Sequence, residues 1–296
     1  MIVADWGTTN LRVYACDDGG TILDRVENSQ GIKSLGQGEY LAALTRATAL
    51  LKECHRGPVF VCGMAGSRNG WIETPYCQAP LDLGALAEQL IPLPAPLDGF
   101  ILPGARTLLP DGTSDVMRGE EVQIFGAGKH FDICNGVLCL PGTHSKWVRL
   151  REGKIIDFAT FMTGDVFQAL SQTILDCDAA APHHPEAFAK GLQAARAGDF
   201  GLLHQLFTAR TRVLDGTLEV DHVSAYVSGL LIGHELAEAG AWRVPGETVT
   251  LIGSESLRRR YSEALAFCGE QCLTLDSSVA ACTGVAALRN ILSGGA

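Results

Sequence analysis

The strongest constraint on this fold is a motif that occurs twice in the sequence. Residues Gly7–Val13 (GTTNLRV) align with residues Gly142–Val148 (GTHSKWV), 135 positions further along the chain (142 minus 7). Each copy follows a short apolar segment and precedes a strand-like segment, a turn that contains glycine and another strand-like segment. Because the same order occurs twice, we expect two related lobes, each with a glycine–threonine hairpin between two strands.

Hydrophobic periodicity predicts strands and helices along the rest of the chain. Strands are expected at residues 1–4, 11–16, 21–26, 58–62, 100–102, 137–140, 145–151, 154–163, 248–252 and 271–275. Helices are expected at residues 39–53, 84–90, 115–126, 164–176, 185–197, 199–210, 219–239, 255–267 and 277–292. This mixture indicates the α/β class. A boundary within residues 127–136 predicts an N-terminal lobe of residues 1–130 and a C-terminal lobe of residues 131–296.

Composition excludes several classes of function. The 296 residues carry 23 basic and 33 acidic side chains, a net charge of −10, so the chain repels the phosphates of nucleic acid. No apolar run reaches the ~18 residues of a membrane-spanning helix, and residues Met1–Asp5 have no basic leader. The ten cysteines include no Cys-x-x-Cys pair, which favours reduced thiols. We therefore expect a cytoplasmic protein that binds small molecules and neither nucleic acid nor membranes.

The two hairpins have the chemistry of an anion site. Glycine in a tight hairpin lets backbone N–H groups converge on one point, and the threonine adds a hydroxyl donor. We expect the hairpins to face each other across a cleft and to hold a polyphosphate from both sides; the alternative is a pair of ordinary turns. Asp5 ends an apolar strand, where a carboxylate suits a hard cation such as Mg²⁺; the alternative is a solvated strand end.

Three segments resemble the nucleotide motifs of sugar kinases in the hexokinase–actin superfamily. Residues Asp5–Arg12 resemble the first phosphate motif, and Leu138–His144 resemble the second. Residues Thr250–Leu257 lie where the adenosine motif belongs, with Ser254 in place of its second glycine. The resemblance implies a two-lobed actin-like ATPase (ribonuclease H-like) fold, with mixed sheets flanked by helices and a cleft between the lobes. It implies ATP and Mg²⁺ as cofactors, with the nucleotide bound by Gly7, Thr8, Thr9, Asn10, Gly142, Thr143, His144, Gly253 and Ser254.

Four further segments resemble one family within that superfamily. Residues Val116–Glu121, Pro141–His144, Phe161–Gly164 and Ser228–Gly233 together are similar to the 2-dehydro-3-deoxygalactonokinases. The resemblance implies ATP-dependent phosphorylation of the 6-hydroxyl of 2-dehydro-3-deoxy-D-galactonate, in galactonate breakdown. The alternatives are a kinase for another sugar or keto-deoxy sugar acid, a non-catalytic sugar sensor on the same fold, and an ATPase whose acceptor is water.

Phosphoryl transfer to an alcohol requires a group that accepts the hydroxyl proton. Sugar kinases of this superfamily place an acid late in the first lobe, near a helix start, and the resemblance implies Glu120 in that role. Aspartate is the more familiar base in this superfamily, so a glutamate at this place departs from the usual pattern. Glu121 and Asp115 are the alternatives. For at least one of these acids the alternative role is structural, because a helix dipole favours acidic side chains in the first turn.

A 2-keto acid substrate carries a carboxylate that an acidic protein must meet with local donors. The planar guanidinium of arginine binds both carboxylate oxygens, and the expected contacts are Arg12, Arg68 and Arg118, with Arg106 as a further candidate. Ser67, in the loop after a predicted strand, is expected to contact the sugar hydroxyls. The alternative for each arginine is a solvated surface position. A homodimer is the expected assembly on the base rate of oligomeric proteins.

Overall fold

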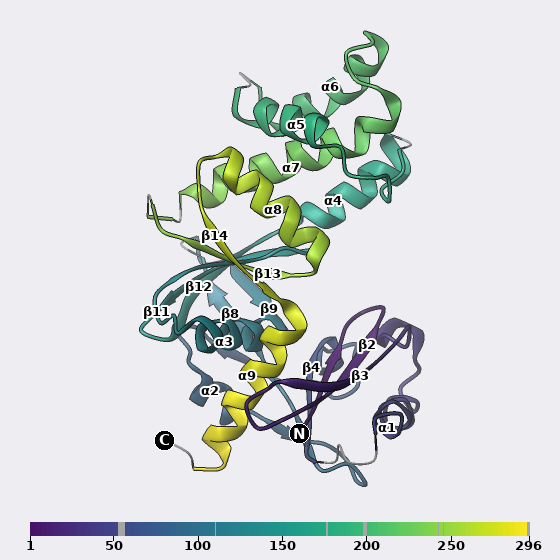
Figure 1. Ribbon diagram of the computed structural model, residues 1–296. Helices are drawn as coiled ribbons and strands as arrows, with labels where there is room; N and C mark the ends of the chain where they lie inside the picture. The colour runs from purple at the N-terminus through teal and green to yellow at the C-terminus, as the bar shows by residue number, and fades with distance from the viewer. Residues whose placement is uncertain are drawn as a thin grey trace. The chain divides into compact units, whose positions relative to one another are not determined.

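The computed structural model describes residues 1–52, 57–109, 111–175, 177–197, 200–241, 243–244 and 246–294 (Figure 1). Its contacts divide the chain into two compact units. Unit 1 contains Met1–Leu138, Val148–Ala159 and Leu275–Ala296, and unit 2 contains Cys139–Trp147 and Thr160–Thr274. Both units draw on separate stretches of sequence, and the division into residues 1–130 and 131–296 stays a prediction.

Unit 1 contains a six-stranded sheet in the order β3-β2-β1-β4-β7-β6. Its strands are β1 (Ile2–Trp6), β2 (Leu11–Cys16), β3 (Ile22–Asn28), β4 (Val59–Gly63), β6 (Ile91–Pro92) and β7 (Gly99–Ile101). Strands β1, β2 and β3 are antiparallel neighbours, whereas β4 runs parallel to β1, with Asp5 opposite both Arg12 and Cys62. Because β1 and β4 are parallel, their carboxyl ends lie at the same edge of the sheet.

A second sheet repeats this strand order. Its strands are β10 (Gly136–Leu140), β11 (Ser145–Arg151), β12 (Lys154–Phe161), β13 (Val249–Gly253) and β14 (Cys272–Asp276). They are arranged as β12-β11-β10-β13-β14, which matches β3-β2-β1-β4-β7 of the first sheet position by position. The duplicated motif therefore corresponds to a duplicated sheet, with each glycine–threonine loop joining the first two strands of its copy.

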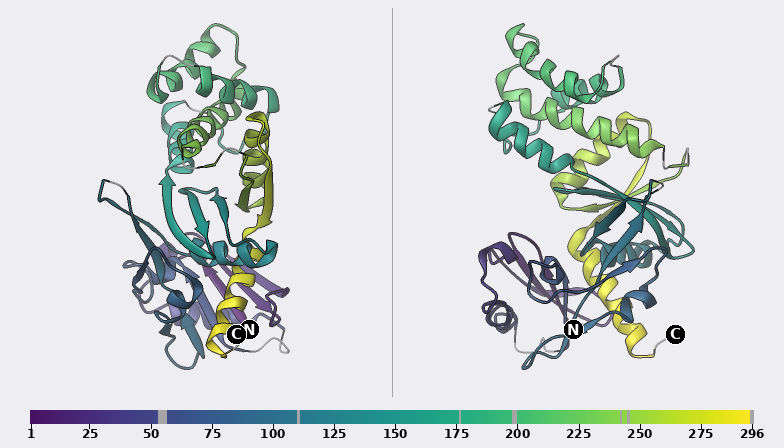
Figure 2. Two further views of the ribbon diagram at one scale, coloured as in Figure 1. Left: turned by 90° about the vertical axis from the view of Figure 1, so that its left-hand side faces the viewer. Right: turned by 180° about the vertical axis from the view of Figure 1, so that it is seen from behind.

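The helices complete the expected mixed α/β architecture. They are α1 (Tyr40–Ala49), α2 (Leu83–Ala87), α3 (Glu120–Phe131), α4 (Thr163–Ala169), α5 (Pro185–Ala197), α6 (Leu202–Leu214), α7 (Val223–Gly240), α8 (Glu255–Phe267) and α9 (Ser277–Leu292). Helices α5 and α7 cross closely in unit 2 (Figure 2). Gly191 permits this approach, since a Cβ atom there would lie only 2.1 Å from the Tyr226 carbonyl oxygen. Helices α3 and α9 of unit 1 meet in the same way at Gly126 and Gly284.

One sequence prediction is wrong and others are confirmed. The predicted helix over residues 115–126 begins only at Glu120, because Ser114–Met117 forms strand β9 and Gly119 turns the chain with φ +104°. Strand β9 belongs to a sheet that periodicity missed, ordered β5-β8-β9, with β5 at Tyr76–Gln78 and β8 at Gly104–Leu108. The helices predicted at residues 185–197, 255–267 and 277–292 are confirmed at both ends. The helix predicted at residues 39–53 ends at Ala49, and its last residue lies outside the described residues.

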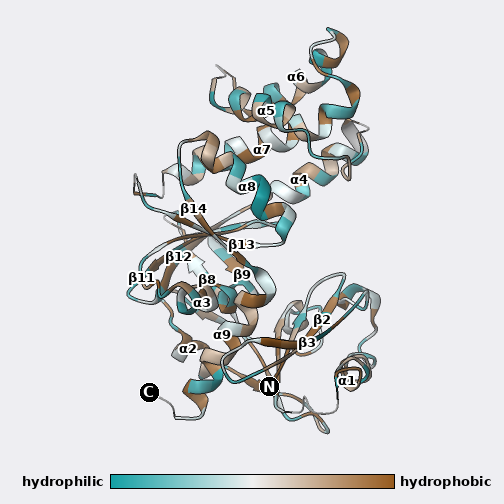
Figure 3. Cartoon of the chain, viewed as in Figure 1, coloured by the Kyte–Doolittle hydropathy of each residue, from teal (hydrophilic) through white to brown (hydrophobic). Residues whose placement is uncertain are grey.

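Apolar residues follow the strands of both sheets, shown in brown in Figure 3. The ring of Trp6 in β1 contacts the rings of Tyr40 and Trp71, with centroids 5.6 and 5.9 Å away, so Trp71 is a packing residue. The nine described cysteines are free thiols. Among the described residues, no helix combines the length and the apolar character needed to cross a membrane.

Candidate functional site

The first hairpin, Gly7–Asn10, is held by the segment that follows β3. The backbone N–H groups of Gly31, Ile32 and Lys33 donate to the carbonyl groups of Thr9, Gly7 and Thr8, at 3.0, 3.1 and 3.2 Å. A Cβ atom at Gly31 would lie only 2.2 Å from the carbonyl carbon of Thr9. The shape of this hairpin therefore depends on a glycine that lies outside the motif.

Asp5 lies one residue from the end of β1, with 20% of its side chain exposed. Arg12, across the strand pair, places Nη1 3.7 Å from Oδ2 of Asp5 and donates from Nε to Glu27 at 2.8 Å. Burial raises the pKa of Asp5, and the Arg12 charge opposes that rise. The guanidinium of Arg12 is thus already engaged by two carboxylates of the same unit.

The start of α3 lies beside Asp5 at the carboxyl end of β4. A Cβ atom at Gly119 would lie 3.0 Å from the Cα atom of Gly63, and one at Gly63 would lie 3.4 Å from Oδ1 of Asp5. Both glycines have positive φ, +104° and +88°, which side chains rarely tolerate. The two glycine turns therefore place the start of α3, with Glu120 and Glu121, next to the end of β1 that carries Asp5. These three acids are called the acid cluster below.

Cys62 lies opposite Asp5 on the neighbouring strand β4. Burial and the negative charges of the three acids raise the pKa of its thiol well above the ordinary value. The two glutamates of the acid cluster differ in exposure. Glu121 is fully buried, both of its oxygens accept the Gly119 N–H, and burial together with the Glu120 charge raises its pKa to about 8. Glu120 is half-buried and accepts the N–H of Arg118 at 3.0 Å. The alternative acid Asp115 lies in strand β9, not at the helix start.

Two buried polar atoms of unit 1, which belong to Ser67 and Arg118, have no hydrogen-bond partner among the described residues. They are the Ser67 hydroxyl, 8% exposed as a residue, and Nε of Arg118. Both residues are neighbours of Gly66. Ser67 follows it in the sequence, and a Cβ atom at Gly66 would lie 2.9 Å from Nη1 of Arg118. The guanidinium is otherwise held by the hydroxyl and carbonyl oxygens of Thr74 and lies over the Tyr76 ring at 4.2 Å. Sequence patterns gave no signal for Thr74 or Tyr76.

The other candidate arginines of unit 1 have partners at the surface. Arg68 is 86% exposed and pairs with Glu73 at 3.4 Å. Arg106 donates to the Ser114 hydroxyl at 3.3 Å along the β8–β9 pair. The structure therefore places Ser67 and Arg118 next to Gly66, in the segment after β4, and leaves Arg68 and Arg106 exposed at the surface.

The second hairpin, Gly142–His144, is held by the start of α4. The Asp165 N–H donates to the Thr143 carbonyl at 3.0 Å, and the Asp165 carboxylate lies 2.7 Å from Nε2 of His144. A Cβ atom at Gly164 would lie 2.4 Å from the Gly142 carbonyl oxygen, so only glycine fits there. Thr143 and His144 are both exposed.

The turn from β13 into α8 lies beside the second hairpin within unit 2. A Cβ atom at Gly253 would lie 3.6 Å from the Pro141 carbonyl oxygen, and Ser254 is exposed at the first position before α8. A small cavity of about 50 Å³ lies between Gly142 of the hairpin and helix α8. It is lined by Gly142, Thr163, Gly164, Phe167, Ser228, Leu231, Ile232, Leu257, Arg260 and Tyr261. Three of the four segments that resemble the galactonokinases therefore contribute to one cavity: Pro141–His144, Phe161–Gly164 and Ser228–Gly233.

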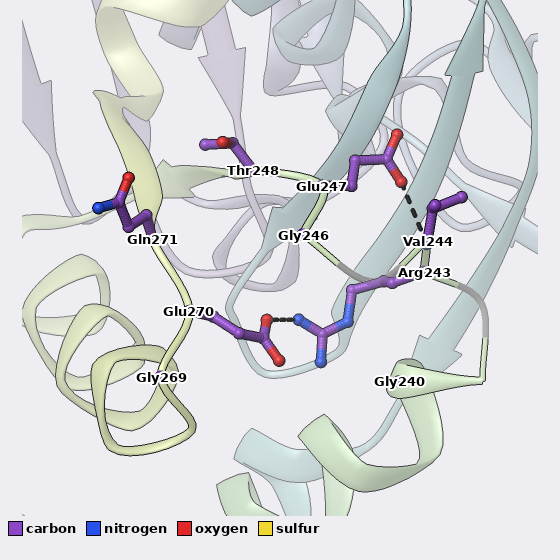
Figure 4. Close-up of a pocket in the computed structure, with 9 residues that line it drawn as sticks. All are labelled: Gly240, Arg243, Val244, Gly246, Glu247, Thr248, Gly269, Glu270 and Gln271. Atoms are coloured by element: carbon purple, nitrogen blue, oxygen red, sulfur yellow. Dashed lines mark hydrogen bonds and ion pairs between the residues drawn. The ribbon is translucent and has the colours of Figure 1, made fainter.

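A larger cavity, of about 510 Å³, contains none of the predicted site residues. Figure 4 shows that it lies where β13 and β14 begin, at the end of these strands opposite to the Gly253 turn. Its lining includes Arg243 and Glu270, which form an ion pair. Within the part of the chain that the structure describes, no group of three histidine, cysteine or acidic side chains is placed to hold a metal ion.

Comparisons with known proteins identify the family of this chain. The sequence model of the 2-keto-3-deoxy-galactonokinase family matches residues 5–288. The probable 2-dehydro-3-deoxygalactonokinase DgoK1 of Rhizobium meliloti (strain 1021) is 33% identical over 291 residues, 96% of this chain and 94% of that protein. The 2-dehydro-3-deoxygalactonokinase of Escherichia coli (strain K12) is 34% identical over 265 residues, 89% of this chain and 88% of that protein.

A solved structure from Sinorhizobium meliloti, described as a 2-dehydro-3-deoxygalactonokinase protein, superimposes on this chain with a TM-score of 0.84 at 30% identity. The superposition covers 98% of both chains. The expected fold class of mixed sheets flanked by helices, as in actin-like ATPases, is confirmed. The activator of the 2-hydroxyisocaproyl-CoA dehydratase from Clostridium difficile has the same fold, with a TM-score of 0.55 over 99% of this chain at 11% identity. The family match covers nearly the whole sequence and includes both hairpins, the acid cluster and the Gly253 turn. The chain therefore belongs to the 2-keto-3-deoxy-galactonokinase family.

Proposed function

We propose that this protein transfers the γ-phosphoryl group of ATP to the 6-hydroxyl of 2-dehydro-3-deoxy-D-galactonate, in galactonate breakdown. Family membership over residues 5–288 supports the substrate and the reaction class. The observation that supports the chemistry most directly is the position of the acid cluster, because the start of α3 with Glu120 and Glu121 lies next to Asp5 at the carboxyl ends of β1 and β4. Ligands of open α/β sheets bind at that edge.

Glu120 is the proposed base. In the transfer, the substrate hydroxyl oxygen bonds to the γ-phosphorus, the bond from that phosphorus to the bridging oxygen of ATP breaks, and ADP leaves. The hydroxyl proton passes to the Glu120 carboxylate. Glu120 suits this role better than Glu121 because it is half-buried, whereas Glu121 is fully buried against the Gly119 N–H. A base must reach its proton.

Asp5 is the proposed ligand of Mg²⁺. Carboxylate oxygens suit this hard cation, which commonly keeps several water ligands and binds through one or two carboxylates plus phosphates. The raised pKa of Asp5, caused by burial, supports the assignment, because a cation beside a buried carboxylate offsets the cost of its charge. When bound, Mg²⁺ would neutralise part of the phosphate charge.

Both hairpins are proposed to contact the phosphates of ATP, through Gly7, Thr8, Thr9 and Asn10 in unit 1 and Gly142, Thr143 and His144 in unit 2. The donors would be backbone N–H groups and the hydroxyls of Thr8 and Thr143, whereas the Gly7 N–H is already used by the Asn10 carbonyl at 2.9 Å and closes the hairpin. Gly253 and Ser254, with the adjoining cavity, are proposed to contact the nucleoside. The closeness of Gly253 to Pro141, at the base of the second hairpin, supports this placement.

Ser67 and Arg118 are the proposed contacts of the sugar acid. Buried polar atoms are almost always hydrogen-bonded, so two unpartnered ones beside the acid cluster indicate groups that a polar ligand satisfies. Arg118 would bind the carboxylate and Ser67 a hydroxyl or the keto oxygen. Arg12 and Arg68 are more exposed and are proposed only as outer contacts.

A coupled assay of ADP release tests this function. Purified protein with ATP and Mg²⁺ is given 2-dehydro-3-deoxy-D-galactonate, its gluconate-type isomer, or no acceptor. We expect rapid release only with a keto-deoxy sugar acid, and the 6-phosphate as product by mass spectrometry. Release without any acceptor would indicate an ATPase, and tight binding of the acid without turnover would indicate a sensor. The expected homodimer stays a prediction, which light scattering of the same preparation tests.

A further inference from the structure

We propose that Glu235, on helix α7, is a positioning residue that holds the second hairpin and the adjoining cavity in the shape that binds ATP. The inference rests on the proposed function, because it takes the second hairpin as a phosphate-binding loop. No sequence pattern pointed to Glu235, which lies just after the Ser228–Gly233 segment.

The carboxylate of Glu235 is buried, with 3% of the residue exposed, and it accepts hydrogen bonds from three different elements. Oε1 accepts the indole N–H of Trp147, from β11, at 2.8 Å. Oε2 accepts the hydroxyl of Tyr261, from α8, at 2.7 Å. Oε2 also accepts the hydroxyl of Thr163, the first residue of α4. Ser145, the first residue of β11, extends the network through a 2.9 Å hydrogen bond to the Tyr261 hydroxyl.

These partners belong to the elements that form the proposed nucleotide site. Strand β11 begins directly after the second hairpin, so Ser145 and Trp147 fix the strand by which the hairpin ends. Thr163 precedes Gly164, which packs on the Gly142 carbonyl. Thr163 and Tyr261 also line the small cavity. A single carboxylate therefore connects the strand after the hairpin, the helix that holds the hairpin, and one wall of the cavity.

A carboxylate suits this set of donors. The indole N–H of Trp147 can only donate, and the hydroxyls of Tyr261 and Thr163 donate to Glu235 as well. An amide in place of the carboxylate can still accept from Trp147, but its NH2 group donates, so the two hydroxyls must turn to accept from it and the network changes. Burial raises the pKa of Glu235, and its hydrogen bonds oppose the rise. A buried charge is costly and tolerated when its partners are complete; here all three partners belong to elements of the proposed nucleotide site.

The test compares Glu235→Gln and Tyr261→Phe with Tyr226→Phe as a matched control. Tyr226 is on α7, fully buried, and its hydroxyl bonds to Thr208 and Arg212, away from the hairpin and the cavity. We expect Glu235→Gln to raise the KM for ATP about tenfold, the loss of roughly one well-made hydrogen bond to a charged group, with the KM for the sugar acid changed less than about twofold. Tyr261→Phe should raise the KM for ATP by a smaller factor. Tyr226→Phe should lower the melting temperature without moving either KM.

The outcomes separate this inference from the proposed function. An unchanged KM for ATP in both Glu235→Gln and Tyr261→Phe, with melting temperatures lowered as in the control, would assign the network to stability alone and overturn the inference. Where Glu235→Gln yields no folded protein, Tyr261→Phe against Tyr226→Phe decides. Thr143→Ala is measured alongside: if it raises the KM for ATP while the network variants do not, only the inference fails. If Thr143→Ala also leaves that KM unchanged, the proposed contact of the Thr143 hydroxyl with ATP fails with it.

Discussion

Both carboxylate oxygens of Glu121 accept the backbone N–H of Gly119, at 2.9 and 2.7 Å, although the residues are only two positions apart. The contact turns the Glu121 side chain back into the protein at the start of α3. It leaves Glu120 as the half-buried acid of the pair, with one oxygen on the Arg118 N–H. Two adjacent glutamates thus have different environments, and each gives a separate prediction.

Glu121 should make the stability of the protein fall as pH rises. Its pKa in the folded protein is about 8, raised from an ordinary value of 4.5, so between these values the folded chain keeps a proton that the unfolded chain loses. Folding is therefore favoured at the acid end of this window, and the slope is at most about 1.4 kcal/mol per pH unit. Glu121→Gln removes the titration. Melting temperatures are measured at pH 5, 6.5 and 8 for both proteins. The difference between them should shift in favour of the variant as pH rises, and a difference that does not change with pH would contradict the burial of this acid.

Glu120→Gln should lower kcat by roughly 10²-fold or more and leave nucleotide affinity almost unchanged. The amide keeps the size of the side chain and an oxygen that accepts the Arg118 N–H, but it cannot accept the substrate proton. Steady-state kinetics measures kcat, and calorimetric titration with ADP measures the affinity. Full turnover in this variant would remove Glu120 as the base and make Asp115 the next acid to test, since Glu121 is buried.

Gly31→Ala should disturb the first hairpin. The new Cβ atom would lie 2.2 Å from the Thr9 carbonyl carbon and 2.4 Å from the Thr8 carbonyl oxygen, so the backbone must move, at a cost of about 1–3 kcal/mol. We expect a lower melting temperature and a raised KM for ATP. Gly38→Ala is the control, because a Cβ atom there meets nothing within 4 Å. Equal KM values for the two variants would show that the hairpin shape does not matter for ATP.

Ser67→Ala should separate binding from stability. The Ser67 hydroxyl is buried without a partner among the described residues, so its removal should leave the melting temperature unchanged or slightly raised. The KM for the sugar acid should rise about tenfold if the hydroxyl contacts the substrate, as the loss of about 1.4 kcal/mol would give. Ser171→Ala serves as the control, since its buried hydroxyl donates to the Phe167 carbonyl at 2.8 Å. That variant should lose stability and keep the KM.

Much of the fold follows from local sequence. The helices at residues 185–197, 255–267 and 277–292 were predictable because a helix that buries one face must repeat apolar residues with its own period, whatever it packs against. The duplicated sheet was predictable for a related reason, since a glycine–threonine loop between two apolar strands forms a hairpin locally. The start of α3 was not, because strand β9 is stabilised by β8, a partner that periodicity cannot reveal.

The sequence by itself determined the residue types of the site: two glycine–threonine hairpins, an acid near the end of β1 and two acids in the segment that begins α3. Only the tertiary structure decided which of two neighbours is accessible. Ser67 is buried while Arg68 is 86% exposed, and Glu121 is buried while Glu120 is not. It also revealed Glu235, whose three partners lie 26 to 88 positions away along the chain. Burial and hydrogen bonding depend on segments distant in sequence that meet only on folding, so no local pattern contains them.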